Sequence, residues 1–370
     1  MSYNSQEHKS SSVSITDSVV AGFVPEKVFR YHQDASVTSL DFDDTGQFLI
    51  SAGVDKSIQL YDVHKGIHHK DIQSQKYGAH SAKFTHHELN CLYASTPGVD
   101  MKIDHAIRYL SLADNQYIRY FKGHKEQVTN IEVHPISDTF LSSSLDRSVK
   151  LWDLRCTLPA GSLGIGQPCV AAFDPKGIIF AIGKYPSPSG RESNKGSLEL
   201  YSMSKFDKGP FLTIQVPTIP GQRWTKLEFS NNGKHILVST DGFEHYVVDA
   251  FKDQVLATLQ AAPNYSPSNY NEDFMTFEYP STASSCFSPC GKYVFMGTNS
   301  PNVLVYDLNH LKSTDTNTVN YQEIKDKQLP FTALSSNRDA SKLVAFNPKL
   351  LAFATANTSV SLWRSQNADG

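Results

Sequence analysis

The chain has 370 residues, of which 39% are hydrophobic and 11% aromatic, enough for a large buried core. Its 34 basic and 37 acidic residues nearly balance, so the charge does not favour strong attraction to nucleic acid or to a membrane. No apolar run approaches the length of a membrane-spanning helix, the N-terminus lacks the apolar core of a signal peptide, and the five cysteines are too scattered for a disulfide framework. We therefore expect an intracellular protein with reduced thiols.

The N-terminal residues 1–23 are rich in Ser and other polar residues and predict a mostly flexible tail. Residues 24–31 (VPEKVFRY) predict a strand that has no turn partner nearby. From Val37 a repeating pattern begins, in which three short strands (VTSLDF, QFLISAG and IQLYD) are separated by two turns. The same pattern then recurs along the chain.

The most complete copy is residues 123–155, GHKEQVTNIEVHPISDTFLSSSLDRSVKLWDLR. Gly-His at its start and Trp-Asp at its end are typical of one blade of a four-stranded propeller. Asp146 is placed to accept a hydrogen bond from His124, and Ser142 is placed to link that pair to the indole N–H of Trp152. Because this order follows the repeat and its members would be buried, we expect a structural chain. A catalytic Ser-His-Asp triad is the disfavoured alternative.

Seven copies are recognised, and each has a residue in the position of Trp152. These residues are Tyr61, Tyr109, Trp152, Tyr201, Val247, Tyr306 and Trp363. Further strand candidates at residues 116–121, 211–216 and 254–259 supply fourth strands, whereas the last copy has only three. The predicted fold is all-β, a seven-bladed WD-repeat β-propeller over residues 24–366. Residues 24–31 close its last blade, and residues 367–370 form a C-terminal tail. Two β-sandwiches in tandem are the weaker alternative.

Several stretches are more specific than the repeat itself, among them QKYGAH, DHAIRYLSLADNQYIRYFKGH, SLDRSVKLWDLR, FDKGPF and WTKLEFSNNGK. Together they resemble one WD-repeat family, the propeller subunit shared by two kinds of nuclear complex. These are the COMPASS-type histone H3 lysine-4 methyltransferase complexes and complexes that end transcription, such as the cleavage and polyadenylation factor with its phosphatase. The resemblance covers residues 17–363 and is strongest over residues 75–252.

The resemblance implies a non-enzymatic nuclear scaffold without cofactors. It implies binding to a segment near the N-terminus of the methyltransferase catalytic subunit, support for methylation that depends on ubiquitinated histone H2B, and membership of the cleavage and polyadenylation machinery. Contacts with the RNA polymerase II tail and the ubiquitinated nucleosome would be indirect, and neither a membrane nor a specific nucleic-acid sequence is an expected partner. The connections 184–195, 261–281 and 309–340 depart from the family, so contacts there would be particular to this lineage.

Two other classes of protein remain as alternatives. One is a WD-repeat substrate receptor or adaptor of a ubiquitin ligase or other signalling complex. The other is a propeller enzyme, which would need clustered carboxylates, histidines or metal ligands at the central channel, and the sequence shows no such set.

One face of the predicted disc is the expected protein-binding face. It collects the loops that lead into each first strand and the turns before each third strand. Its predicted members are Val54, Asp55, Lys56, Leu145, Arg147, Arg223, Trp224, Gly242 and Phe243. Trp and Arg are enriched at interface hot spots, although Trp224 packed inside its blade is an equally good interpretation. Exposed sheet edges, which bind by strand addition, are an alternative docking surface.

Other motifs favour structural interpretations. The pairs at 68–69 and 86–87 are adjacent histidines, whose side chains point to opposite faces of a strand and cannot easily share a metal ion. The segment CFSPC lacks a second ligand pair for zinc. Residues 161–166 (GSLGIG) do not precede a helix pattern and predict a flexible connection. Four basic residues around the third copy predict a solvated surface, with a phosphopeptide site as the weaker alternative: Lys122, Lys125, Arg147 and Lys150.

Overall fold

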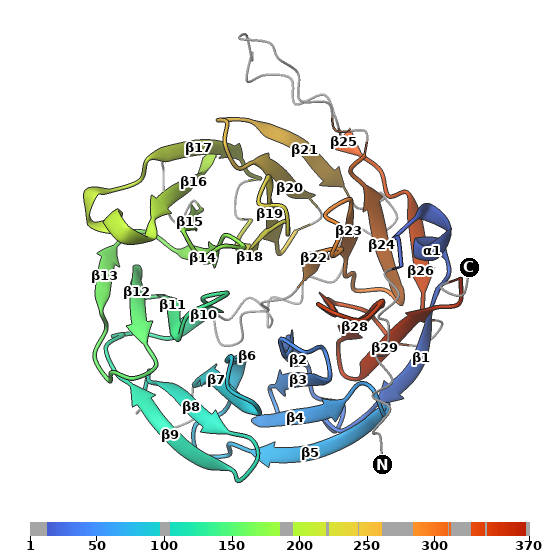
Figure 1. The fold of residues 1–370 in the computed structure, drawn as a ribbon, viewed down its shortest axis with the longest axis horizontal. Coiled ribbons are helices and arrows are strands. Elements are labelled where there is room, and N and C mark those ends of the chain that lie inside the picture. The colour runs from blue at the N-terminus through green and yellow to red at the C-terminus, as the bar shows by residue number, and fades with distance from the viewer. Residues whose placement is uncertain are drawn as a thin grey trace, which may run out of the picture.

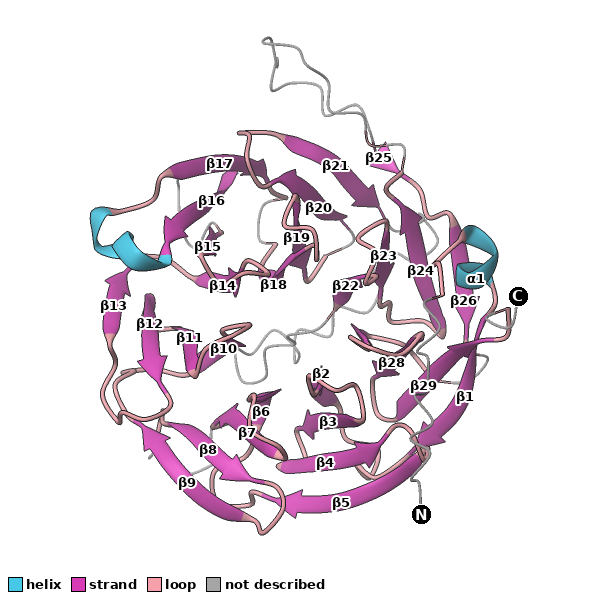
Figure 2. Ribbon diagram, in the orientation of Figure 1, coloured by secondary structure: helices cyan, strands magenta, loops and turns pink. Residues whose placement is uncertain are grey.

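Seven small sheets, antiparallel apart from one added strand, surround a central axis and form a closed ring (Figures 1 and 2). The computed structural model describes residues 13–96, 104–185, 195–219, 222–242, 244–260, 284–309, 311, 327–336 and 339–367. The long connections 261–281 and 309–340, and most of 184–195, lie largely outside these residues. Each sheet is one propeller blade, with its first strand at the axis and its last at the rim.

The first four blades each use four consecutive strands. Blade 1 contains β2 (Val37–Phe42), β3 (Phe48–Gly53), β4 (Ser57–Asp62) and β5 (Ile67–Gln73). Blade 2 contains β6 (His80–Phe84), β7 (Asn90–Ala94), β8 (Ile107–Ser111) and β9 (Gln116–Phe121). Blade 3 contains β10 (Val128–Val133), β11 (Thr139–Ser144), β12 (Ser148–Asp153) and β13 (Gly161–Gly164). Blade 4 contains β14 (Cys169–Phe173), β15 (Ile179–Lys184), β16 (Lys195–Ser202) and β17 (Leu212–Pro217), with the 3-10 helix η1 (Met203–Lys208) before β17.

The last three blades depart from this plan at the rim. Blade 5 contains β18 (Trp224–Phe229), β19 (His235–Thr240), β20 (Glu244–Asp249) and β21 (Val255–Gln260), and a fifth strand, β25 (Lys327–Gln328), pairs in parallel with β21. Blade 6 contains β22 (Ser285–Phe287), β23 (Tyr293–Met296), β24 (Asn302–Asp307) and β26 (Thr332–Ser335). Blade 7 contains β27 (Leu343–Phe346), β28 (Ala352–Ala356), β29 (Val360–Ser365) and β1 (Phe23–Phe29).

Ring closure uses the two ends of the chain. Strand β1 pairs with β29 in antiparallel register from Phe23 opposite Ser365 to Phe29 opposite Val360. The predicted all-β, seven-bladed propeller closed by an N-terminal strand is therefore confirmed. The hydrophobic core is divided into seven clusters, each built from residues of two neighbouring blades, so packing between blades continues around the whole ring.

Regular structure is present within the stretch predicted to be a tail. Residues 17–21 form a short helix, α1 (Asp17–Ala21), whose N-cap Thr16 accepts a hydrogen bond from the Val19 backbone. Val20 is fully buried in the cluster between blades 6 and 7, and the Ser365 hydroxyl donates to the Val19 carbonyl at 2.7 Å. This packing corrects the prediction of a flexible tail for the described part of residues 1–23.

A second correction concerns Gly161–Gly164. These residues form β13, the outer strand of blade 3, in register from Gly161 opposite Leu151 to Gly164 opposite Ser148. The predicted flexible connection is therefore wrong over these four residues. Glycine and serine are poor strand formers, and here pairing with β12 overrides that weak local preference.

A third correction concerns two of the seven residues that were predicted to occupy the position of Trp152. That position lies opposite Phe140, and its side chain packs between its own blade and the preceding one. In blades 2 and 5 the corresponding residues are Leu110, opposite Cys91, and Val248, opposite Ile236. Tyr109 and Val247 are one residue off and face the following blade instead, because successive side chains on a strand alternate.

Candidate functional site

The four residues of the predicted polar chain in blade 3 meet in the structure. The Nδ1 atom of His124 lies 2.9 Å from Asp146 Oδ2, and its Nε2 atom lies 2.7 Å from Ser142 Oγ. The indole N–H of Trp152 donates to the same Ser142 oxygen at 2.8 Å. One consistent arrangement follows: Nδ1–H donates to the carboxylate, the serine hydroxyl donates to Nε2, and the serine oxygen accepts from the tryptophan.

The protonation of this chain follows from its surroundings. Burial lowers the pKa of His124, and this favours the neutral ring that the arrangement requires. Burial alone would raise the pKa of Asp146, but hydrogen bonds from Ser148, from the Lys125 backbone and from His124 outweigh it and hold that pKa at about 2. The carboxylate is therefore ionised and the imidazole neutral at neutral pH.

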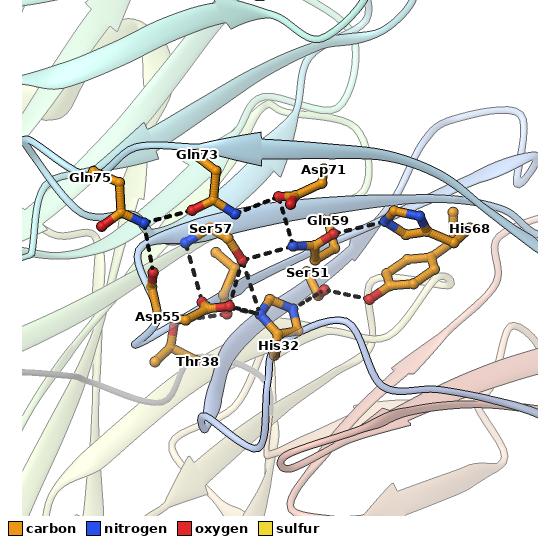
Figure 3. Close-up of polar contacts among 12 residues, drawn as sticks. His32, Thr38, Ser51, Asp55, Ser57, Gln59, His68, Asp71, Gln73 and Gln75 are labelled. Atoms are coloured by element: carbon orange, nitrogen blue, oxygen red, sulfur yellow. Dashed lines mark hydrogen bonds and ion pairs between the residues drawn. The ribbon is translucent and has the colours of Figure 1, made fainter.

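Blade 1 repeats the chain with a tyrosine at its end (Figure 3). His32 Nδ1 lies 3.0 Å from Asp55 Oδ2, and His32 Nε2 lies 2.7 Å from Ser51 Oγ. The Tyr61 hydroxyl reaches the same serine at 3.3 Å. Figure 3 shows how the network continues toward the rim through polar residues of β4 and β5 and the loop that follows, namely Ser57, Gln59, His68, Asp71, Gln73 and Gln75.

Other blades keep only fragments of this chain. In blade 7 the Trp363 indole donates to Thr355 Oγ1 at 2.9 Å, so the pair that corresponds to Trp152 and Ser142 is retained. In blade 5 Gln222 occupies the loop before the first strand and donates to Thr240 Oγ1 at 2.7 Å. Each of these two blades keeps one satisfied polar contact, between two strands in blade 7 and between the loop and the sheet in blade 5, rather than one fixed set of residues.

The geometry of the chain resembles a Ser-His-Asp triad, but its position does not suit catalysis. Ser142 is fully buried, and its oxygen already accepts the indole hydrogen bond, so a substrate carbonyl has no path to it. The His124 side chain is 1% exposed. The arrangement therefore ties a loop, a turn and a strand together.

The residues predicted for the protein-binding face separate into distinct groups. Lys56 and Arg147 occupy equivalent turns with φ of 63° and 61°, and Arg147 is exposed. Val54 and Leu145 lie beside them and are half-buried. The Asp55 carboxylate belongs to the polar chain of blade 1 and is engaged by His32 and Ser57 rather than presented to solvent.

The blade 5 part of this face differs from the prediction. Trp224 is only 2% exposed, and its ring lies against the backbones of Gly183 and Gly196, where a Cβ atom would come within 2.6 and 2.3 Å of it. The prediction that Trp224 is an exposed anchor is therefore wrong. The Arg223 guanidinium is half-buried and pairs with Asp241 at 3.1 Å. Gly242 is half-buried, and Phe243 lies outside the described residues.

The inner strands carry a set of charged residues that sequence reasoning missed. Asp41, Lys83, Glu132 and Glu228 occupy equivalent positions, one residue before the last residue of each inner strand. Lys83 Nζ lies 3.3 Å from Asp41 and 3.8 Å from Glu132. The signal was the recurrence of charge at one position in VTSLDF, SAKF, VTNIEV and WTKLEF.

These charges connect neighbouring blades close to the axis. Asp41 accepts a hydrogen bond from the Phe84 backbone at 2.8 Å, and Glu228 accepts one from the Phe287 backbone at 2.9 Å. Burial raises the pKa of Asp41 and of Glu132, while the neighbouring lysines oppose that shift. Lys83 and Lys226 balance these acids, and Asp41 and Glu228 bond to the backbone of the next blade, so the set links neighbouring blades.

The histidines of the two adjacent pairs contact aromatic or acidic side chains. His68 stacks on Tyr31 with ring centroids 3.6 Å apart, and His86 lies 2.6 Å from Asp44. Within the described residues, no group of three or more His, Cys, Asp and Glu side chains is arranged to hold a metal ion. Those same residues include no helix with the length and apolar character needed to cross a membrane.

Comparison with known proteins agrees with the fold. The family described as "WD domain, G-beta repeat" matches residues 23–62 and 115–153. The chain is 36% identical to WD repeat-containing protein 82 of Drosophila melanogaster over 97% of this chain and 99% of that protein. It is 34% identical to Set1 complex component swd2 of Schizosaccharomyces pombe, over 95% and 99%, and 37% identical to COMPASS component SWD2 of Saccharomyces cerevisiae, over 88% and 90%. With seven blades, an N-terminal closing strand and similarity over nearly its whole length, the chain belongs to the WD-repeat propeller family that contains these three proteins.

Proposed function

We propose that the chain is a nuclear, non-catalytic scaffold subunit of a COMPASS-type histone H3 lysine-4 methyltransferase complex. The observation that carries this proposal is its similarity, over nearly the whole chain, to two relatives named as components of the Set1 and COMPASS complexes. In this role the propeller binds the methyltransferase subunit and supports methylation that depends on ubiquitinated histone H2B.

The structure supports a scaffold in two ways. The triad-like geometries of blades 3 and 1 are buried and engaged in structural hydrogen bonds. The charged residues near the axis are paired with one another and with backbone groups. Both observations favour a rigid ring whose rim and loops carry the contacts.

We further propose membership of the cleavage and polyadenylation machinery, on the sequence resemblance described above. The alternative is a substrate receptor or adaptor of a ubiquitin ligase. Affinity purification of the tagged full chain from its own cells, followed by mass spectrometry, separates these functions. We expect to recover a histone methyltransferase catalytic subunit together with polyadenylation-factor subunits, and an untagged strain is the control.

Recovery of cullin adaptors without a methyltransferase would overturn the proposal in favour of the alternative. Recovery of the methyltransferase without polyadenylation-factor subunits would retain the first role and remove the second. Both outcomes are read from the same purification.

A further inference from the structure

The outer strand of blade 2 presents an unusually apolar edge. Strand β9 (QYIRYF) has β8 as its only strand neighbour among the described residues. Its residues Tyr117, Ile118 and Tyr120 are 40%, 45% and 39% exposed. A strand edge of this composition is a template on which another strand can pair.

The rims of three other blades carry features that hinder such pairing. In blade 4 the Asp253 carboxylate caps the Gln215 backbone N–H, and Pro217 has no N–H to offer. In blade 7 the outer strand FVPEKVF carries a proline, a bulge and two charged residues. In blade 1 the outer strand IHHKDIQ is mostly polar. Aromatic and aliphatic side chains dominate the edge of blade 2 instead.

Blade 5 shows that a rim strand of this propeller accepts an added strand. Strands β9 and β21 carry the same bulge, since Ile118 and Leu256 are the extra residues opposite β8 and β20. Counting from that bulge, Tyr120 and Phe121 correspond to Thr258 and Leu259. Those two residues of β21 are the ones that pair with β25. The edge of β9 therefore has the local shape that already binds a strand elsewhere in the same molecule.

A pocket of about 460 Å³ adjoins this edge between blades 2 and 3. It is lined by Ile118, Arg119, Tyr120, Lys122, Thr157 and Leu158. The two charged residues of the lining are both cations, and Leu158 is 72% exposed. Although Tyr120 contributes to this lining, its ring lies 5.3 Å from that of Tyr117 and 5.9 Å from the Arg108 guanidinium, and Tyr120 is paired opposite Arg108. The Tyr117 hydroxyl bonds at 2.9 Å to that of Tyr93, which packs between blades 1 and 2, so this pair of rings marks the side of β9 that faces blade 1.

We propose that the β9 edge binds an extended segment of a partner protein by strand addition, and that this segment carries acidic and apolar residues. Because alternate side chains of a strand point to opposite sides, one set reaches the apolar and basic pocket while the other packs on Tyr117 and Tyr120. The acidic residues complement Arg119 and Lys122. This inference rests on the proposed function, and it names the surface by which the scaffold holds one of its complex partners.

Hydrogen exchange tests the inference with the full chain. The probe is the methyltransferase complex purified through a tag on this chain, compared with the free chain at matched concentration. Strand addition protects the outward-facing amides of residues 116–121, and we expect their exchange to slow at least about tenfold in the complex. The outer strand β5 of blade 1 serves as the internal reference.

Two matched pairs of variants test the side-chain contacts. Ile118→Glu and Leu158→Glu place an acid at the proposed surface, and we expect each to lower partner recovery by roughly tenfold. Ile67→Glu, at an isoleucine 47% exposed on the rim of blade 1, and Ile136→Glu, at one 71% exposed in a turn of blade 3, are the controls. All four side chains are exposed, so we expect unchanged melting temperatures and, for the controls, unchanged recovery.

The outcomes separate this inference from the proposed function. If the wild-type chain recovers the methyltransferase but residues 116–121 exchange as fast as in the free chain, strand addition at β9 is wrong and the proposed function stands. If those amides become protected in the free chain as its concentration rises, the occupant is a second copy of this chain, which also overturns the proposal. If the wild-type chain recovers no methyltransferase, the proposed function fails, and the inference fails with it.

Discussion

Blades 3 and 1 contain the same hydrogen-bonded chain in two different settings. In blade 3 the chain ends on Trp152, whose N–H lies 2.8 Å from the serine, and the Asp146 side chain is 8% exposed. In blade 1 it ends on Tyr61, whose hydroxyl lies 3.3 Å from the serine, and the Asp55 side chain is 16% exposed. The feature common to both blades is thus the His-Asp-Ser linkage, whereas the aromatic donor varies.

The histidines of the two hydrogen-bonded chains also lie on different segments of the polypeptide. His124 lies on the connection between blades 2 and 3, whereas His32 follows β1, the strand that closes the ring. The polar chain of blade 1 is therefore coupled to ring closure, and that of blade 3 is independent of it. This difference predicts different responses to truncation and substitution.

Removal of residues 1–31 is the most severe way to probe this difference. It deletes β1, exposes the edge of β29 and removes Tyr31 from its stack on His68. We expect unfolding or aggregation, because an open ring leaves an unpaired strand and an uncovered core. Thermal melting and size-exclusion chromatography measure this, and a soluble truncated protein that melts at the wild-type temperature would contradict the account.

Asp146→Ala should be the most damaging single substitution in the two polar chains. It leaves His124 Nδ1 and three further donors, the Lys125 and Ser148 backbone N–H groups and the Ser148 hydroxyl, without an acceptor. We therefore expect the free energy of unfolding to fall by roughly 2–4 kcal/mol. Urea denaturation measures the loss. Arg155→Ala, which removes an exposed partner of Asp153, is the control and should leave the free energy of unfolding unchanged within the error of the measurement.

Asp55→Ala should cost less than Asp146→Ala, by our expectation roughly 1–2 kcal/mol. The Asp55 carboxylate is more accessible to water, and Ser57 and Gln59 lie close enough to reorganise around His32. The same urea experiment provides the comparison. If Asp55→Ala lowered the free energy of unfolding as much as Asp146→Ala or more, the exposure of the carboxylate would not determine how much each polar chain stabilises the fold.

Acid should weaken the polar chain of blade 3, with a smaller effect than the substitutions above. Asp146 has a pKa of about 2 in the folded protein against an ordinary value of 3.8, so its stabilisation is present above pH 4 and is lost as the pH falls toward 2. Burial lowers the pKa of His124, so its contribution is lost earlier, as the pH falls below its ordinary value of 6.5. Asp146→Asn should flatten the stability profile between about pH 4 and pH 2 in urea titrations, and an unchanged profile would count against this assignment.

The sequence predicted the features that recur and missed those that depend on distant partners. The recurring strand–turn–strand–turn–strand pattern with aromatic-Asp ends was sufficient for seven blades, and the missing strand of the last copy was sufficient for ring closure. The most complete copy was sufficient for the chain at His124. Tyr109 matches the aromatic residues that occupy this position in most copies, yet the alternation of the strand decides which side chain faces the preceding blade, and that side chain is Leu110.

The burial of Trp224 could not be predicted from the sequence around it either. Its burial depends on Gly183 and Gly196 in the preceding blade, which leave room for the ring, and no local pattern around residue 224 reveals them. Likewise, the added strand β25 follows a long connection, and a two-residue strand carries no periodic signal.

Histone H3 lysine-4 methylation by the reconstituted complex tests most directly whether the chain acts as a scaffold rather than through its triad-like residues. The assay compares complexes that lack this chain, contain the wild type, or contain Ser142→Ala, at a temperature below the melting point of the variant. The account predicts reduced methylation without the chain and full restoration by both forms, because Ser142 only supports the fold. Failure of a folded, assembled Ser142→Ala chain to restore methylation would contradict it.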